Sequence, residues 1–420
     1  MIANIRFLPI LPWTASIKQI STQLGKQMLN SLEIKNFRAL EYFKVAKLGR
    51  VNLIVGKNNS GKSTVLEALR IYAGNAYPKL LENIAASHDE KYKPEFIILD
   101  EPDTSIIPFE DLFTGRQLPD DETEIIIGES TDSDQALHIC HRFHISKEEN
   151  VTDAEGNIHI SKSGDYVTKR SFIDWTKGQI SDDLGLIREI LLVMKNNMSF
   201  PIYLNSRTLD IASLNISFFS KKRGATKCSF IPTQLVSIDE LAQEWGSIVG
   251  TEHEEVVKQA LRIILPEFQE IYFVPNTSST NKSKYIAKVK LPNLPRPVPL
   301  KSLGDGMVRI LQLALKLVSA QGGFLLIDEL ENGLHYSIQE RVWAWLFEVA
   351  ERLDIQVFAT THSWDCIENF TKVAIANETT EGVLFRMGKS AKTSNRGQII
   401  ATVFDKDSLY RMTQADIEIR

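Results

Sequence analysis

Cysteine is scarce in this chain: only Cys140, Cys228 and Cys366 occur among 420 residues. They lie far apart and form no C-x-x-C pair, which excludes a disulfide framework and is typical of a reducing cytosol. No apolar run approaches the roughly 20 residues that a membrane-spanning helix needs. The apolar residues 7–13 are interrupted by two prolines and lack a small-residue cleavage site, so a signal peptide is not expected. We therefore expect a cytoplasmic protein with no membrane segment.

The chain also has no excess of positive charge that would point to nucleic acid. Its formal net charge is −5, although a local basic groove would be compatible with that value. Apolar residues make up 43% and charged residues 24%, as in ordinary globular proteins, and the length suits roughly two to three domains. Residues 1–27 are expected to be an N-terminal extension, because a second methionine, Met28, stands just before the first clear strand.

The sequence does contain a complete phosphate-binding signature. The apolar segment VNLIVG (51–56) leads into GKNNSGKS, which matches G-x-x-x-x-G-K-[ST], and a helical segment follows. In such a loop backbone N–H groups surround phosphate oxygens, the lysine adds charge, and the serine hydroxyl suits Mg²⁺. The helix N-terminus also attracts anions. The residues expected to bind ATP phosphates are Gly56, Lys57, Asn58, Asn59, Ser60, Gly61, Lys62, Ser63 and Thr64.

An acidic pair follows a second apolar run. Residues 324–327 are all apolar, as in a strand buried on both faces of a parallel sheet, and Asp328 and Glu329 come next. Ligands bind beyond the carboxyl ends of such strands. We therefore expect Asp328 to lie near the Mg²⁺ held by Ser63, and Glu329 to activate the attacking water.

A third apolar strand, residues 357–359, ends in polar residues that include His362. At the end of a neighbouring strand, a neutral imidazole can hydrogen-bond the γ-phosphate or the water. We therefore predict that His362 takes part in catalysis. ATP is favoured over GTP, because the segment NKSK (281–284) lacks the aspartate of the N-K-x-D motif of G proteins.

The pattern along the chain predicts an α/β fold that is split by an insertion. Strands and helices alternate at both ends, with helices expected at 306–320, 336–352 and from 364, and strands at 324–328, 355–361 and 373–376. We divide the chain into a first ATPase lobe with a β-rich region (28–173), a helical insertion (174–298) and a second ATPase lobe (299–420). The insertion is expected to begin with a helix over residues 174–197.

Together these motifs resemble the ABC-type P-loop ATPases of the SMC, RecF and OLD group. The opening SLEIKNFRAL (31–40) is similar to that group's first strand. The resemblance covers residues 28–74 and 300–377, and implies a two-lobed head with a mixed sheet. It also implies homo-oligomers in which two heads share two ATP sites. By the same resemblance, Arg38 lies near the nucleotide, and residues 331–335 touch the partner head.

The resemblance further implies that a signature segment reaches the nucleotide of the other head. The segment KSLGDGMVRILQLALKL (301–317) occupies that place, and Ser302, Gly304 and Gly306 are its expected contacts. The group commonly has L-S-x-G-[EQ] there, whereas this chain has glycine in place of the serine and methionine in place of the last residue. The apolar stripe of the helix is expected to face the second lobe, with Arg309, Gln312 and Lys316 on its polar side.

Several members of the group are excluded. The chain has no long heptad coiled coil, which excludes a full SMC or RecN arm. It also lacks the acidic cluster after His362 that a fused TOPRIM nuclease would have, so full-length OLD nuclease is not expected. The size and the tail FDKDSLYRMTQADIEIR resemble stand-alone bacterial defence ATPases, such as the ATPase of the PARIS anti-phage system, which works beside a separate TOPRIM-type effector. The alternative is a RecF-like repair or recombination ATPase that binds DNA directly. A scaffold with little or no hydrolysis is a third hypothesis.

Three other features leave alternatives open. On a strand, His138, Cys140 and His144 of HICHRFH would share a face, which allows either a zinc site or an ordinary strand. The segment FFSKKRG (218–224) is compatible with DNA contact or with a solvated loop. Arg207 follows a short strand and could serve lobe packing or a nucleotide-dependent contact.

Overall fold

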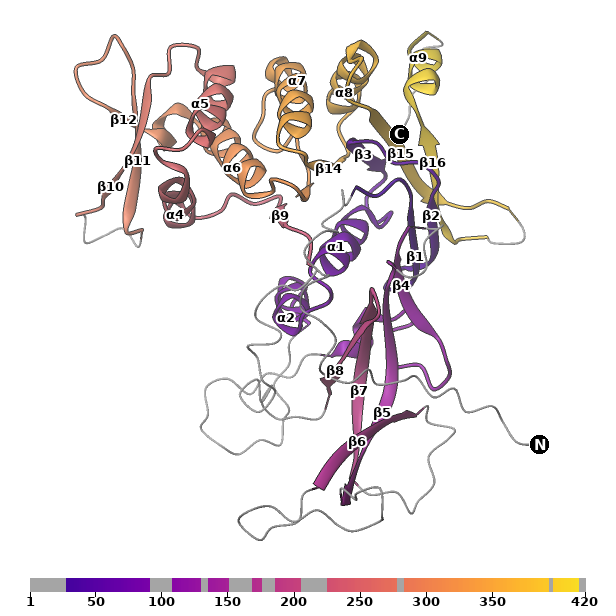
Figure 1. The fold of residues 1–420 in the computed structure, drawn as a ribbon. Helices are drawn as coiled ribbons and strands as arrows, with labels where there is room; N and C mark the ends of the chain where they lie inside the picture. The colour runs from indigo at the N-terminus through magenta and orange to yellow at the C-terminus, as the bar shows by residue number, and fades with distance from the viewer. Residues whose placement is uncertain are drawn as a thin grey trace.

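The computed structural model describes residues 28–90, 108–129, 135–150, 168–175, 186–204, 225–277, 283–392 and 396–414. The expected extension at 1–27, the basic segment 218–224 and Arg207 lie outside these residues. Among the described residues, no helix has the length and apolar character needed to cross a membrane. Figure 1 shows a row of helices, α4 to α9, at one end and a long antiparallel sheet extending from the other side.

A six-stranded sheet forms the centre of the ATPase fold. Its strand order is β16-β15-β3-β14-β13-β9, and all neighbours pair in parallel except β15 and β16. The strands are β3 (Val51–Gly56), β9 (Cys228–Ile231), β13 (Phe324–Ile327), β14 (Gln356–Thr361), β15 (Gly382–Lys389) and β16 (Ile399–Phe404). This mixed sheet with helices on both faces confirms the α/β P-loop ATPase fold expected from the sequence.

The central strands are buried on both faces, and alternate residues belong to different cores. In β13, Leu325 and Ile327 pack with the helices α4 to α8, whereas Phe324 and Leu326 pack with α1. This two-sided burial explains why β13 is an uninterrupted apolar run. The helices are α1 (Lys62–Ala73), α2 (Pro78–Ser87), α4 (Ile238–Ile248), α5 (His253–Ile264), α6 (Asp305–Ser319), α7 (Tyr336–Arg352), α8 (Trp364–Ala376) and α9 (Lys406–Gln414).

Two expectations for this part of the chain are wrong, one about a strand and one about a side of a helix. The strand expected at 373–376 is the last turn of α8. The side of α6 expected to be polar is mostly buried, because Arg309 and Gln312 are fully inaccessible, while Lys316 is bonded to Glu240 and Glu244 of α4. Helix α6 lies between other elements instead of at the surface (Figure 1), so its polar residues also meet protein.

A seven-stranded antiparallel sheet packs on the other side of α1. Its order is β2-β1-β4-β5-β7-β8, with β6 paired to β5. The strands are β1 (Leu32–Phe37), β2 (Leu40–Val45), β4 (Glu124–Gly128), β5 (Leu137–Asn150), β6 (Thr168–Trp175), β7 (Leu186–Lys195) and β8 (Met198–Tyr203), and a 3₁₀ turn, η1 (Phe109–Leu112), lies beside them.

The helix expected over 174–197 is therefore wrong, because β7 occupies its second half. Asn196 and Asn197 both have positive φ and join β7 to β8 as a two-residue hairpin. Strand β9 also lies within residues 174–298 and belongs to the central sheet. The boundaries of the three expected regions remain a prediction.

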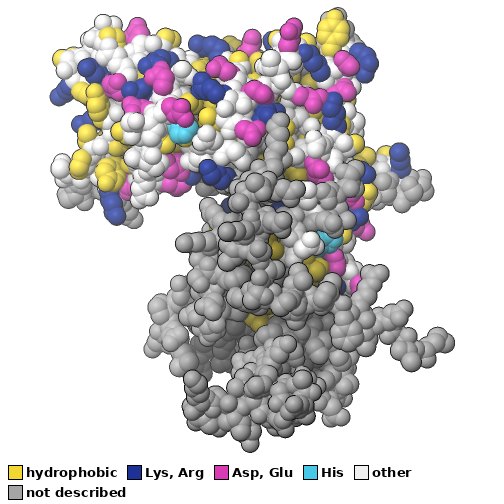
Figure 2. All heavy atoms as spheres, in the orientation of Figure 1, with side chains coloured by type: hydrophobic (Ala, Val, Ile, Leu, Met, Phe, Trp, Pro, Cys, Tyr) yellow, Lys and Arg dark blue, Asp and Glu magenta, His cyan; other side chains and the backbone are white. Residues whose placement is uncertain are grey.

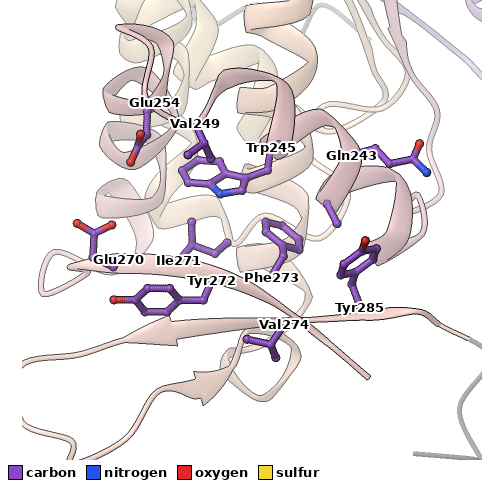
Figure 3. Close-up of a pocket in the computed structure, with 12 residues that line it drawn as sticks. Gln243, Trp245, Val249, Glu254, Glu270, Ile271, Tyr272, Phe273, Val274 and Tyr285 are labelled. Atoms are coloured by element: carbon purple, nitrogen blue, oxygen red, sulfur yellow. The ribbon is translucent and has the colours of Figure 1, made fainter. Parts of the chain in front are cut away.

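A small three-stranded sheet lies beside α4 and α5. It contains β10 (Glu270–Pro275), β11 (Tyr285–Lys290) and β12 (Val298–Pro299), and a short 3₁₀ helix, η3 (Leu300–Leu303), leads from it to α6. A cavity of about 530 Å³ opens between α4 and β10. Figure 3 shows Trp245 above Ile271 and Phe273, and Tyr272 and Tyr285 at the margin of the cavity. None of the expected site residues lines this cavity.

Candidate nucleotide site

The phosphate-binding loop joins the end of β3 to the first turn of α1. Gly61 has φ 90°, and Asn59 also has positive φ. Gly56 is required by close packing, because a Cβ atom there would lie 2.7 Å from both the Met387 carbonyl oxygen and Ser60 Oγ. The predicted strand, glycine-containing loop and helix are therefore present in the order that the motif needs.

Lys62 is folded back over this loop. Its Nζ donates to the carbonyl oxygens of Gly56 at 2.8 Å and Lys57 at 3.1 Å. Partial burial lowers the pKa of Lys62, while the carboxylates of Asp328, Glu329 and Glu331 act in the opposite direction. The ammonium group thus lies between the loop and the acidic residues, where the outer phosphates of a nucleotide would place negative charge.

Ser63 and Asp328 meet at the edge of the central sheet. Ser63 Oγ is 3.3 Å from each carboxylate oxygen of Asp328, although 265 residues separate them. Two threonines orient the same carboxylate: Thr360 donates to Oδ1 at 2.7 Å and Thr233 to Oδ2 at 3.4 Å. A hydroxyl beside a carboxylate, next to a phosphate-binding loop, fits the oxygen ligands that Mg²⁺ prefers.

Glu329 is held in an unusual backbone conformation. Its φ is 50°, and its N–H donates to Thr360 Oγ1 at 2.9 Å. A non-glycine residue with positive φ carries strain and depends on its surroundings to stay there. His362 Nδ1 lies 3.4 Å from Oε1 of both Glu329 and Glu331. Both catalytic candidates therefore face each other across the ends of β13 and β14.

Some contacts of the acidic pair were not expected from the sequence. Thr360 comes directly after the apolar run 357–359, near the end of β14, and that position is the signal that could have identified it. Arg309 gave no such signal, yet its guanidinium donates to the carbonyl oxygens of Pro232, Asp328 and Glu329. Burial lowers the pKa of Arg309 to about 10, and the nearby carboxylates oppose this shift.

The expected signature segment forms the start of α6. Gly304 has φ 97°, and a Cβ there would meet open space. Gly306 is different, because its Cβ would lie 2.9 Å from the Gly333 carbonyl oxygen of the same chain. Ser302 Oγ donates to the Pro299 carbonyl oxygen at 2.6 Å. In the described part of the chain, no hydrogen bond connects these residues to the phosphate-binding loop.

Arg38 lies beside α1 but is engaged by carboxylates. Its guanidinium donates two hydrogen bonds to Glu90, at 2.7 and 2.8 Å, and its Nε is 3.3 Å from Glu67 of α1. Glu67 also contacts His88, and this contact raises the pKa of His88. A role of Arg38 in nucleotide binding stays a prediction.

The histidine-rich strand uses its polar groups inside the antiparallel sheet. Glu124 of β4 accepts from Cys140 and Arg142 and lies 2.9 Å from His138 Nδ1. The side chain of His144 lies outside the described residues. No group of three or more histidine, cysteine, aspartate or glutamate residues suited to a metal ion occurs in the part of the chain described here.

Two known proteins are similar in sequence to this chain or to a segment of it. The chain is 25% identical over 351 residues to an ATP/GTP phosphatase of Helicobacter pylori. The aligned region covers 82% of this chain and 88% of that protein. A 53-residue segment, 13% of this chain and 10% of the relative, is 43% identical to the OLD nuclease of Thermus scotoductus. That segment match agrees with the resemblance drawn from the motifs.

Solved structures and a family model complete the comparison. An SMC head bound to the C-terminal winged-helix domain of ScpA is 11% identical, with a TM-score of 0.42, over 90% of this chain and 98% of that one. The SMC head domain from Thermotoga maritima is 14% identical, with a TM-score of 0.38, over the same shares. Residues 28–367 match the AAA ATPase domain model. Since this region covers most of the chain and includes the loop, the acidic pair and His362, the chain belongs to the AAA ATPase domain family.

Proposed function

We propose that the protein binds and hydrolyses ATP with Mg²⁺ as an ABC-type ATPase. Gly56–Thr64 would hold the phosphates, and Ser63 and Asp328 would hold the metal, whose charge would offset that of the phosphates. The observation that carries the proposal is the position of Ser63 Oγ, 3.3 Å from both oxygens of Asp328. Two residues from distant parts of the chain would thus hold the metal beside the loop.

The proposed chemistry uses Glu329 as the general base. Its carboxylate accepts a proton from a water that attacks the γ-phosphate, and His362, 3.4 Å from Glu329, donates a hydrogen bond to the phosphate or the water. Lys62 stabilises the charge of the outer phosphates. The hydrogen bond from Glu329 N–H to Thr360 Oγ1 fixes the start of the loop that carries the base.

The Glu329→Gln substitution tests this assignment. Glutamine keeps the size of the side chain but does not accept the proton, so ATP should bind with unchanged affinity while turnover falls by about 100-fold or more. Binding is measured with a fluorescent ATP analogue, and turnover by phosphate release. Turnover equal to that of the parent would contradict the role of Glu329.

We further propose that two heads share their nucleotide sites. Gly304, the residue before α6, and Asp305, its first residue, are both exposed, and α6 is fifteen residues long, so its N-terminus would attract an anion. Because α1 already supplies a helix N-terminus to the chain's own loop, the partner for α6 is the γ-phosphate of ATP on a second copy.

A complementation experiment tests the shared site. Lys62→Ala inactivates the loop, and Asp305→Trp places bulk on the exposed start of α6 without entering the chain's own core. Each variant alone should lack turnover, and the mixture should regain it, because one composite site then combines an intact loop with an intact α6. A mixture as inactive as its components would contradict the shared site.

The biological role that we propose is a nucleotide-dependent sensor in bacterial anti-phage defence, of the type found in the PARIS system. ATP binding would close the heads, and a separate effector, such as a TOPRIM-type nuclease, would carry the damaging activity. Phage plating on cells that carry the parent gene region, compared with the Lys62→Ala variant, tests this role. Equal phage titres on both would contradict it.

A second candidate is a RecF-like ATPase that binds DNA directly. On the face drawn in Figure 2, acidic and basic side chains are interspersed over the helices, and no basic cluster dominates. The net charge of −5 also favours the sensor. Tight DNA binding that weakens steeply with salt would favour the RecF-like role instead.

A further inference from the structure

Arg309 is a fully buried cation that bonds to backbone. It lies on α6 with 0% of its surface exposed. Its Nη1 donates to the Pro232 carbonyl oxygen at 2.7 Å, and its Nη2 donates to those of Asp328 and Glu329 at 3.0 Å each. The buried Nε has no hydrogen-bond partner among the described residues, so the guanidinium depends on these three carbonyl groups, because burying a charge without hydrogen bonds is costly.

The carbonyl groups that Arg309 holds belong to the residues of the acidic pair. The Asp328 carboxylate faces Ser63, and Glu329 has a φ of 50° that its surroundings must maintain. Since a guanidinium is rigid and planar, one donor that binds both successive carbonyl oxygens fixes the two peptide groups on either side of Glu329. The directions of the Asp328 and Glu329 side chains depend on these peptide groups.

Arg309 also lies one turn after the start of α6. At that start, Gly306 approaches the Gly333 carbonyl oxygen so closely that a Cβ would lie 2.9 Å from it. Gly333 belongs to the loop that follows the acidic pair. The start of α6 therefore contacts the acidic segment twice, through Gly306 and through Arg309, and a shift of α6 displaces that segment.

We infer that Arg309 is a positioning residue that couples the first turn of α6 to the acidic pair and so sets the alignment of Glu329 for hydrolysis. The inference rests on the proposed ATPase function and adds a connection within one chain. The surface of α6 that is proposed to meet a second copy's nucleotide is linked, through Arg309, to the chain's own catalytic carboxylates.

Two substitutions test the role of Arg309. Arg309→Lys keeps the charge, and Arg309→Gln keeps a neutral donor, but neither reaches all three carbonyl groups. We expect about 10- to 100-fold lower kcat from loss of charged hydrogen bonds to the pair. The Mg²⁺ concentration for half-maximal turnover should rise, because Asp328 is displaced. The Kd for a fluorescent ATP analogue should stay within about threefold, because the Arg309 hydrogen bonds do not involve Gly56–Thr64.

Gln312 supplies a matched control on the same helix. It is also fully buried, and neither of its amide atoms has a hydrogen-bond partner. Gln312→Leu should leave kcat and the Mg²⁺ requirement unchanged. A folded Arg309 variant with parental kcat would overturn the inference, as would equal losses in the Gln312 variant. A parent without ATP turnover would instead contradict the proposed function itself.

Discussion

The two large sheets of this molecule use polar side chains in different ways. In the central, mostly parallel sheet, Asp328, Thr360 and His362 lie at or just beyond the carboxyl ends of neighbouring strands, and Asp328 meets Ser63 there. In the antiparallel sheet, polar residues bind each other across strands, as Glu124 does with His138 and His141 with Glu189. The comparison teaches that side chains beyond parallel strand ends are available for a ligand, whereas those within the antiparallel sheet stabilise the sheet.

The largest expected effect is on the parallel side, at Lys62. Lys62→Ala should abolish ATP binding, because it removes the positive charge beside the phosphates, while the thermal unfolding midpoint changes little. Calorimetric titration with ATP and Mg²⁺ measures the binding, and circular dichroism measures the thermal unfolding midpoint. ATP binding that survives with parental affinity would show that the loop is not the site.

Thr360 should affect turnover without affecting the fold. Thr360→Val removes the hydroxyl that donates to Asp328 Oδ1 and accepts from the Glu329 N–H. We expect about 10- to 100-fold lower kcat, because a hydrogen bond to a charged group is worth about 1.5–3 kcal/mol.

The matched control for Thr360 is Thr371→Val on α8, since Thr371 is also buried and its hydroxyl has no hydrogen-bond partner. It should keep parental kcat. Equal kcat for both variants would remove Thr360 from the site.

Lys195 connects the antiparallel sheet to α1, the helix that follows the glycine-containing loop. Its Nζ donates to the Tyr72 carbonyl oxygen of α1 at 2.8 Å and lies over the Tyr72 ring. Burial lowers the pKa of Lys195 to about 7. Between that value and the ordinary pKa of about 10.4, the unfolded chain binds a proton that the folded chain does not, so this group makes stability rise with pH.

Lys195→Met should therefore flatten the rise of the free energy of unfolding between pH 7 and 10. The slope that it removes is at most about 1.4 kcal/mol per pH unit. Thermal unfolding at several pH values measures it, with Lys79→Met, at an exposed lysine on α2, as the control. Parallel pH profiles for the parent and the Lys195 variant would contradict the assigned burial effect.

The smallest effect is expected at His138. His138→Ala breaks a partly exposed pair with Glu124, which is worth about 0.2–1 kcal/mol, and it should leave ATP turnover unchanged. The same variant tests the zinc alternative. Stoichiometric zinc in the purified parent, lost in His138→Ala, would show that this strand holds a metal after all.

Sequence reasoning worked best where the signal is local. The loop from Gly56 to Ser63 and the run before Asp328 could be recognised, because backbone chemistry and two-sided burial impose their patterns on neighbouring residues. The helix predicted over 174–197 failed, because a short apolar run such as residues 190–194 suits a strand or a helix. The pair Asn196-Asn197 was the missed signal, since two such residues favour a hairpin turn.

The amino-acid sequence by itself determined that a loop with the phosphate-binding signature, an acidic pair and a strand-end histidine are present, because each depends on a few consecutive residues. Only the tertiary structure decided that Ser63 meets Asp328, that Thr360 orients the pair, and that Arg309 lies buried beneath it. These contacts join residues that are far apart in the chain. Their geometry follows from parallel strand pairing and from the close packing of α6, and no local pattern records either.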